Sequence, residues 1–204
     1  MATLIQLRRM VRTRLGVTQN DSFFKDDRVD DAINNAIATL EAEKNWHWQL
    51  RSARVETLDD TGVVDLPADH LSSRAVWFDE TELTYVAPYD LERWTQQLGE
   101  PVVWSLIGNQ MFVRPVPHVG TALLITYYRS ASLLFEDNDS PDLPSNAYPA
   151  IVAKAAQLCS TREDDRPSAQ AHMLEYEQWV QRLTVSAKDQ TRPVGRRIRP
   201  GSWI

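Results

Sequence analysis

The spacing of hydrophobic residues predicts two amphipathic helices near the N-terminus, because apolar residues recur there every three or four positions. The first helix ends at Gly16 and has the apolar face Leu4, Leu7, Val11 and Leu15. A polar loop follows, and Asp26 or Asp27 can cap the second helix. The apolar face of that helix is Val29, Ile33, Ile37 and Leu40, and we expect the helix to run into the aromatic sequence WHW at 46–48.

The hydrophobic period then changes to two, which is typical of half-buried strands. We predict strands over residues 52–58, 63–66, 74–78, 83–86, 102–107, 110–114 and 121–129. Gly108-Asn109 supplies a two-residue hairpin turn between two of them. A short helix is expected over residues 89–97.

The last third of the chain again has a helical period. One helix is expected over residues 146–162, and Asp164 or Asp165 can cap another that starts near Pro167. The apolar face of this last helix is Ala169, Met173, Tyr176, Val180, Leu183 and Ala187. Its heptad-like spacing requires a partner helix. We therefore predict an α+β fold in which the helices of both chain ends form a bundle around a β-rich insertion.

The predicted domain organisation is one domain over residues 1–189 and an extended basic arm over residues 190–204. Within the domain, residues 3–49 and 145–189 form the helical core and residues 50–130 form the insertion. A chain of 204 residues with 43% hydrophobic content can bury a substantial core. No apolar run approaches the ~20 residues that cross a bilayer, so we expect no membrane contact.

Cysteine content and the start of the chain indicate a protein made in a reducing cytoplasm. Cys159 is the single cysteine, which excludes an intramolecular disulfide, and its place on an apolar helix face predicts a buried, inert thiol. Arginines are interleaved with the first apolar residues instead of preceding an apolar block, so the N-terminus is not expected to be a signal peptide.

Charge is distributed very unevenly along the chain. The net charge is −6, yet residues 1–19 and residues 190–204 carry +4 each, which leaves −14 for the residues between them. Such asymmetry predicts basic interaction segments on an acidic body, or charges that merely keep the ends soluble. Candidate phosphate or partner contacts on the first helix are Arg8, Arg9, Arg12 and Arg14. Alternatively, their aliphatic stems pack within the bundle.

A search for catalytic chemistry finds none of the usual motifs. The sequence lacks GxxxxGK[ST], GxGxxG, HExxH and GxSxG, and its four histidines stand apart from other metal-binding residues. The acidic segment 135–146 loosely resembles a calcium loop but lacks the Gly and Glu that an EF-hand requires. We therefore expect no enzymatic activity, no cofactor and no metal.

A series of short motifs gives the chain a family resemblance. In order they are Asp65-Leu66-Pro67, Pro88-Tyr89-Asp90, Pro101 with Trp104, Arg114-Pro115-Val116-Pro117, Tyr127-Tyr128-Arg129 and Leu143-Pro144. This order, over residues 26–185, resembles that of the head-to-tail adaptor proteins of tailed bacteriophages, which are also called connector or head completion proteins.

The resemblance implies a structural virion protein of the phage neck. Members of that family form a closed ring, typically dodecameric, that docks on the portal protein, extends the DNA channel and offers an attachment surface to the tail. The implied partners are the portal, a tail-side neck or tail-completion protein, further copies of the chain, and double-stranded DNA that passes through without sequence-specific binding.

The basic arm lies outside the resemblance and is interpreted from its own residues. Its prolines and glycines disfavour a helix, so we expect an extended segment that docks on the portal or on a neighbouring subunit. Candidate docking residues are Arg192, Arg196, Arg197, Ile198, Arg199, Trp203 and Ile204. The same arginines could instead neutralise DNA phosphates.

Two other function classes are weighed against the adaptor. A DNA-binding regulatory protein could use the basic termini, but the basic helix has no helix-turn-helix spacing and the body is strongly acidic. A hydrolase using scattered carboxylates would need a convincing acid pair, which the sequence does not offer.

Overall fold

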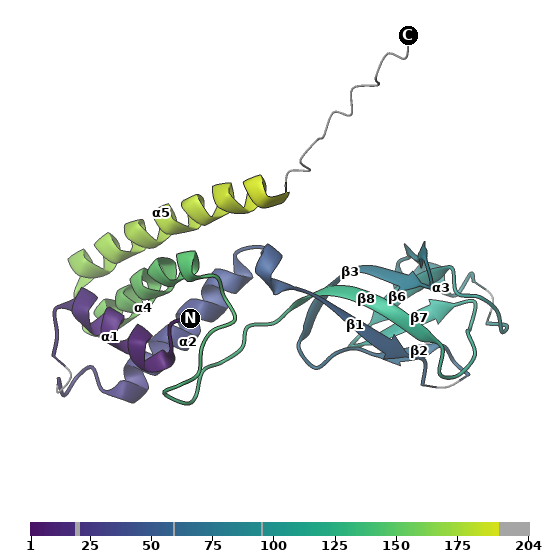
Figure 1. The fold of residues 1–204 in the computed structure, drawn as a ribbon, viewed down its shortest axis with the longest axis horizontal. Coiled ribbons are helices and arrows are strands. Elements are labelled where there is room, and N and C mark those ends of the chain that lie inside the picture. The colour runs from purple at the N-terminus through teal and green to yellow at the C-terminus, as the bar shows by residue number, and fades with distance from the viewer. Residues whose placement is uncertain (19–20, 59, 95, 192–204) are drawn as a thin grey trace, which may run out of the picture. The chain divides into compact units, whose positions relative to one another are not determined.

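The computed structural model describes residues 1–18, 21–58, 60–94 and 96–191, which fold into two compact units (Figure 1). Of the described residues, the helical unit combines those of 1–40 with 133–191, and the β unit comprises those of 41–132. The fold is α+β, as predicted.

The helical unit is built from helices that come from both ends of the chain. Its long elements are α1 (Leu4–Leu15), α2 (Asp26–Ala42), α4 (Tyr148–Arg162) and α5 (Arg166–Thr191). A 3-10 turn, η2 (Ser145–Ala147), precedes α4. Helix α4 packs against both α1 and α5, and Figure 1 shows α5 lying along α4. The predicted apolar faces of α1 and α2 are buried at these positions: Leu4, Leu7, Val11, Val29, Ile33, Ile37 and Leu40.

The end of α1 and the start of α5 follow the predicted signals, whereas Asp26 and Asp27, the predicted caps of α2, lie within its first turn. Gly16 caps α1 with φ of 71°, a left-handed conformation that glycine adopts without steric cost. Asp165 precedes α5, and its carboxylate accepts a hydrogen bond from the backbone N–H of Ser168 at 3.2 Å. On the predicted face of α5, Tyr176 and Leu183 are buried.

The β unit is a sandwich of two four-stranded sheets, with strand orders β1-β8-β3-β4 and β2-β7-β6-β5. The first sheet contains β1 (Leu50–Glu56), β8 (Ala122–Arg129), β3 (His70–Phe78) and β4 (Thr81–Glu82). The second contains β2 (Val63–Asp65), β7 (Gln110–Arg114), β6 (Val103–Ile107) and β5 (Thr84–Tyr85). Among the pairings between these strands, β5–β6 is parallel and the others are antiparallel, and a further parallel bridge joins Leu98 and Val116. Side chains of both sheets share one core, which includes Val76, Trp104, Met111 and Ile125.

Two predicted helix boundaries are wrong. Helix α2 ends at Ala42, and the 3-10 turn η1 (His47–Gln49) follows in place of a continuous helix. The helix expected over residues 89–97 is only α3 (Pro88–Leu91). The chain leaves the helix because Gln97 and Gly99 form backbone hydrogen bonds with Val116, at 3.0 Å and 2.9 Å. This long-range pairing overrides the local helical pattern.

Candidate partner-binding surfaces of the helical unit

The predicted docking residues of the arm lie outside the described residues. Helix α5 extends to Thr191, past the predicted start of the arm at residue 190. The seven candidates Arg192, Arg196, Arg197, Ile198, Arg199, Trp203 and Ile204 follow that point. Their docking role stays a prediction.

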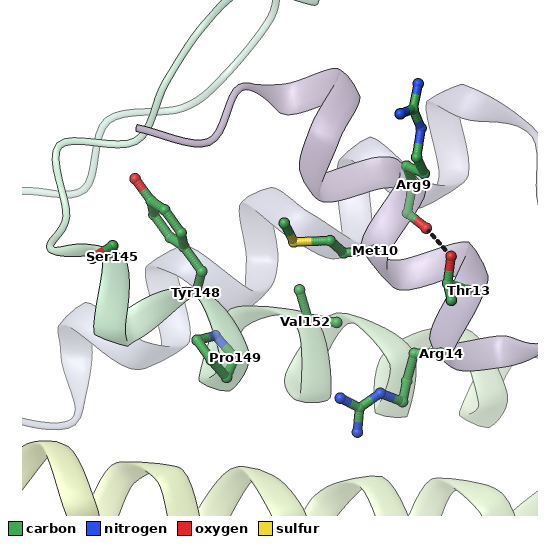
Figure 2. Close-up of a pocket in the computed structure, with 8 residues that line it drawn as sticks. All are labelled: Arg9, Met10, Thr13, Arg14, Ser145, Tyr148, Pro149 and Val152. Carbon is green, nitrogen blue, oxygen red and sulfur yellow. Dashed lines mark hydrogen bonds between the residues drawn. The ribbon is translucent and has the colours of Figure 1, made fainter.

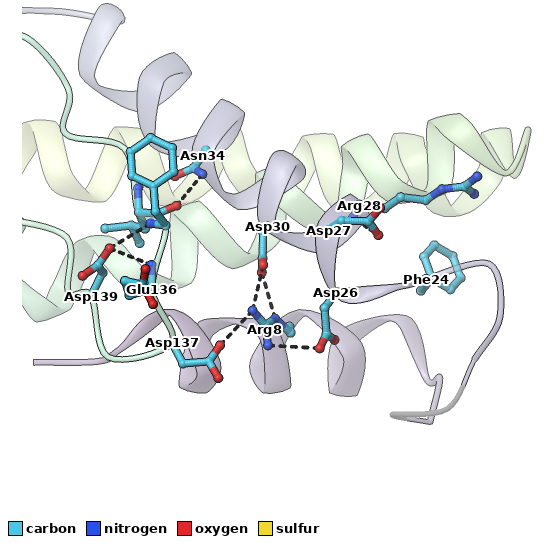
Figure 3. Close-up of polar contacts among 12 residues, drawn as sticks. Arg8, Phe24, Asp26, Asp27, Arg28, Asp30, Asn34, Glu136, Asp137 and Asp139 are labelled. Atoms are coloured by element: carbon cyan, nitrogen blue, oxygen red, sulfur yellow. Dashed lines mark hydrogen bonds and ion pairs between the residues drawn. The ribbon is translucent and has the colours of Figure 1, made fainter.

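Arg8 of α1 is enclosed by carboxylates (Figure 3). Its guanidinium donates two hydrogen bonds to Asp30 of α2, from Nε at 2.8 Å and from Nη2 at 2.7 Å. A third bond reaches Asp137 at 3.1 Å, and Asp26 lies 3.3 Å from Nη1. The hydrogen bond to Asp30 is the largest cause of the raised pKa of Arg8. Because the residue is only 8% exposed, its charge depends on these partners.

Arg12, one turn further along α1, is bound in the same way. Its Nη2 donates to the backbone carbonyl of Phe24 at 2.9 Å and to Asp26 at 2.5 Å. The hydrogen bond from Arg12 is the main reason that the pKa of Asp26 is lowered. Arg8 and Arg12 thus lie in the bundle, as the alternative interpretation of the N-terminal arginines expects, and their guanidinium groups are engaged there.

Residues 133–144 form a segment, here called the strap, that closes the helical unit (Figure 3). Asn34 of α2 exchanges two hydrogen bonds with the backbone of Leu134, each of 2.9 Å. The backbone N–H groups of Leu4 and Ile5 donate to the carbonyls of Asp139 and Asp137. The first turn of a helix leaves such N–H groups without intrahelical partners, so the strap completes the start of α1.

A tight turn in the strap presents a hydrophobic side chain to solvent. The carboxylate of Asp139 accepts hydrogen bonds from the backbone N–H groups of Phe135 and Glu136, at 2.8 Å and 2.9 Å. These bonds lower the pKa of Asp139, with the Glu136 bond contributing most. Leu134 beside the turn is buried, whereas Phe135 is 77% exposed. The turn therefore holds an exposed aromatic ring on a fixed backbone.

A groove of about 620 Å³ lies between α1 and the start of α4 (Figure 2). Its lining residues are Arg9, Met10, Thr13 and Arg14 from α1, and Ser145, Tyr148, Pro149 and Val152 from the α4 side. Apolar side chains form the floor and two arginines stand beside it. Its size falls within the ~300–1,000 Å³ typical of ligand pockets.

The two groove arginines differ in how they are held. Arg14 forms an ion pair with Glu175 of α5. Arg9 is exposed, and the hydrogen bond drawn at it in Figure 2 is accepted by its backbone carbonyl from the Thr13 hydroxyl at 2.9 Å. Among the four predicted contact arginines of the first helix, Arg9 and Arg14 are therefore the ones that face this surface.

The described residues contain no group of His, Cys, Asp or Glu side chains placed to hold a metal ion. Cys159 is buried as predicted, and burial raises the pKa of its thiol to about 11. None of the helices in the described ranges has the length and apolar character required to cross a membrane.

An exposed aromatic residue on a fixed turn and an apolar groove flanked by two arginines thus lie on the surface of the helical unit. A family model described as SU10 adaptor protein matches residues 2–201. The chain belongs to the SU10 adaptor protein family and is a structural adaptor of bacteriophages. Proteins of this class are structural components of the virion instead of enzymes. None of the curated proteins compared with the chain matches it.

Several residues of these surfaces escaped the sequence analysis. Met10 lies off the apolar face that defines its helix, and Phe135 stands among acids in a loop. Tyr148, by contrast, continues the apolar face of α4, because it precedes Ile151 and Val152 by three and four residues, and it is buried. Met10 could have been found because it is apolar and lies outside the periodic apolar face of its helix. Such a side chain is exposed unless another element covers it.

We predict that Asp30→Ala lowers the free energy of unfolding of the helical unit by about 2–4 kcal/mol, because it leaves the Arg8 guanidinium without its bidentate partner. Asp31→Ala on the exposed side of the same helix is the matched control and should change stability by less than ~0.5 kcal/mol. Urea titration followed by the helical circular dichroism signal measures both. Equal effects of the two substitutions would contradict the assigned role of Arg8.

The lowered pKa values of Asp26 and Asp139 predict a loss of stability in acid. A carboxylate with a lowered folded-state pKa stabilises the fold above its unfolded pKa of ~3.9, and this contribution disappears as the pH falls through the folded value. Stability should hold down to about pH 5 and decline below about pH 4. The double substitution Asp26→Asn with Asp139→Asn should flatten this decline in urea titrations at stepped pH. An unchanged slope would show that other groups cause it.

Proposed function

We propose that the chain forms a closed ring in the phage neck that docks on the portal, extends the DNA channel and carries the attachment surface for the tail. The observation that carries this proposal is the match to an adaptor family along residues 2–201. The collinear motifs of the sequence support the same role, since they span both units.

The charge of the body supports a channel through which DNA slides. Residues between the two basic ends carry a net −14, and an acidic surface does not retain phosphates. The guanidinium groups of Arg8 and Arg12 are occupied by Asp30 and Asp26 within the helical unit. That occupation favours the adaptor over the alternative of a DNA-binding regulatory protein, because two of the four helix arginines are bound internally.

The β unit offers a second contact surface for the portal or the tail. Around α3 and the β5–β6 edge, large apolar side chains are exposed, among them Tyr85, Tyr89, Trp94, Leu98 and Ile107. Tyr89 is 73% exposed. Aromatic residues of this kind dominate the energetics of protein interfaces.

We assign the basic arm to docking on the portal or on a neighbouring subunit. Arg196, Arg197 and Arg199 would pair with carboxylates there, and Trp203 would anchor the end of the arm. Packaged DNA is the competing partner for the same arginines.

Electron microscopy of the purified protein, alone and mixed with portal, tests the ring. We expect rings, or rings seated on portal particles. Adaptors can assemble only on a template, so the mixture is the decisive sample. Portal particles that stay bare at saturating protein, together with a protein that remains monomeric, would overturn the proposal.

Truncation after Thr191 tests the arm and leaves α5 intact. Loss of residues 192–204 should weaken portal binding by about tenfold or more, and Trp203→Ala should account for much of that loss because buried aromatic anchors carry interface energy. A variant with glutamine at Arg196, Arg197 and Arg199 separates charge from the anchor. Portal binding by the truncated protein that equals that of the full chain would exclude docking by the arm.

A further inference from the structure

The strap turn has the properties of an anchor for a protein interface. Exposed hydrophobic residues are common and carry little meaning by themselves. Phe135 differs because its own N–H and that of Glu136 donate to Asp139, while Asn34 accepts a hydrogen bond from the N–H of Leu134 and donates one to its carbonyl. A side chain on such a backbone loses little conformational entropy when it binds.

The α1–α4 groove has the shape and lining to accept such an anchor. Met10, Tyr148, Pro149 and Val152 give it apolar walls, and its 620 Å³ can enclose an aromatic ring with neighbouring atoms. Tyr148 is fixed at the floor, where its hydroxyl accepts a hydrogen bond of 3.2 Å from the backbone N–H of Ala2. This bond fixes the Tyr148 ring in place within the groove.

Charge is complementary between the strap and the groove. The strap contains no lysine or arginine, and it exposes Glu136 beside the anchor, whereas Asp137 is paired with Arg8 and Asp139 with backbone N–H groups of its own turn. The groove is flanked by Arg9, which is exposed, and by Arg14, which is paired with Glu175. An acidic segment with an aromatic residue therefore matches this groove, whereas the arginine-rich arm of the chain would meet like charge there.

Phe135 is not among the residues that line the groove, so the anchor and its acceptor are separate patches of the helical unit. A contact between two different patches of identical subunits is heterologous, and it generates a ring when the rotation closes. This geometry is the one that a ring-forming adaptor requires.

We propose that the helical unit of each copy inserts Phe135 into the α1–α4 groove of the next copy, with Glu136 placed beside Arg9. The occupant of the groove is thus a second copy of this chain. The inference rests on the proposed ring and identifies the two surfaces that form its subunit contact.

Cross-linking between two different cysteine variants tests this contact. Glu136→Cys and Thr13→Cys place one thiol beside the anchor and one in the groove, and both leave Phe135 and Met10 in place. Mixed under oxidising conditions, with portal present where rings need it, they should form a disulfide-linked dimer. Either variant alone should form no such dimer, because its copies carry only one of the two thiols that meet in the contact. Cys159 does not interfere because it is 2% exposed and the pKa of its thiol is about 11.

Two controls make the result specific. Leu174→Cys on α5, where the side chain is 54% exposed, replaces Thr13→Cys as the matched control and should cross-link to Glu136→Cys at least about tenfold less. Phe135→Ala added to Glu136→Cys should reduce the yield with Thr13→Cys by a similar factor. Equal yields with either partner would overturn the proposal.

The outcomes separate this inference from the proposed function. Rings seen by electron microscopy without the cross-link would overturn the anchor contact and leave the ring standing. The cross-link without rings would support the contact and count against ring closure. Blockage of portal binding by Met10→Glu, with self-association unchanged, would show that the groove belongs to the portal and would overturn the inference.

Discussion

One guanidinium group joins the three segments on which the helical unit depends. Arg8 of α1 bonds to Asp30 of α2 and to Asp137 of the strap, at 2.7–3.1 Å. The β unit is inserted between residues 40 and 133, so the two flanks of the insertion must be held together by contacts that are distant in sequence. A nearly buried arginine does this strongly, because its charge is stabilised away from water by the carboxylates that bond to it.

The same set of contacts determines what the unit presents to its surroundings. At about 100° per residue, Leu4, Leu7, Arg8, Val11 and Arg12 share the inner arc of α1, and the outer arc carries Arg9, Met10 and Thr13. Fixing the strap buries Leu134 and turns Phe135 outward. Docking of the strap on α1 and α2 therefore both completes the ion pairs of Arg8 and exposes Phe135. A substitution that breaks these ion pairs should also change how Phe135 is presented.

The long amphipathic helices could be predicted because hydrophobic period and capping residues act within a few positions, as at Gly16 and Asp165. The end of the helix expected over residues 89–97 could not be predicted in this way, because the backbone groups of Gln97 and Gly99 form hydrogen bonds with Val116, which is distant in sequence. The pairing of Arg8 with Asp30 is equally non-local. The position of Arg8, four residues after Leu4, does place it on the buried face of α1, but its partner on α2 does not follow from that spacing. The family was recognisable from motif order, whereas the groove depends on how α1 meets α4.

The four arginines of α1 divide into two that are bound within the helical unit and two that lie at its surface groove. Arginines bound within the bundle contribute little to the field outside it, so the acidic body dominates the surface that DNA would meet. The other two arginines of α1, Arg9 and Arg14, are exposed at an apolar groove, where desolvation would strengthen the attraction of Arg9 to a carboxylate. In the proposed ring, subunit association and passage of DNA would therefore use different cations, so that the contact between subunits would not hold the DNA.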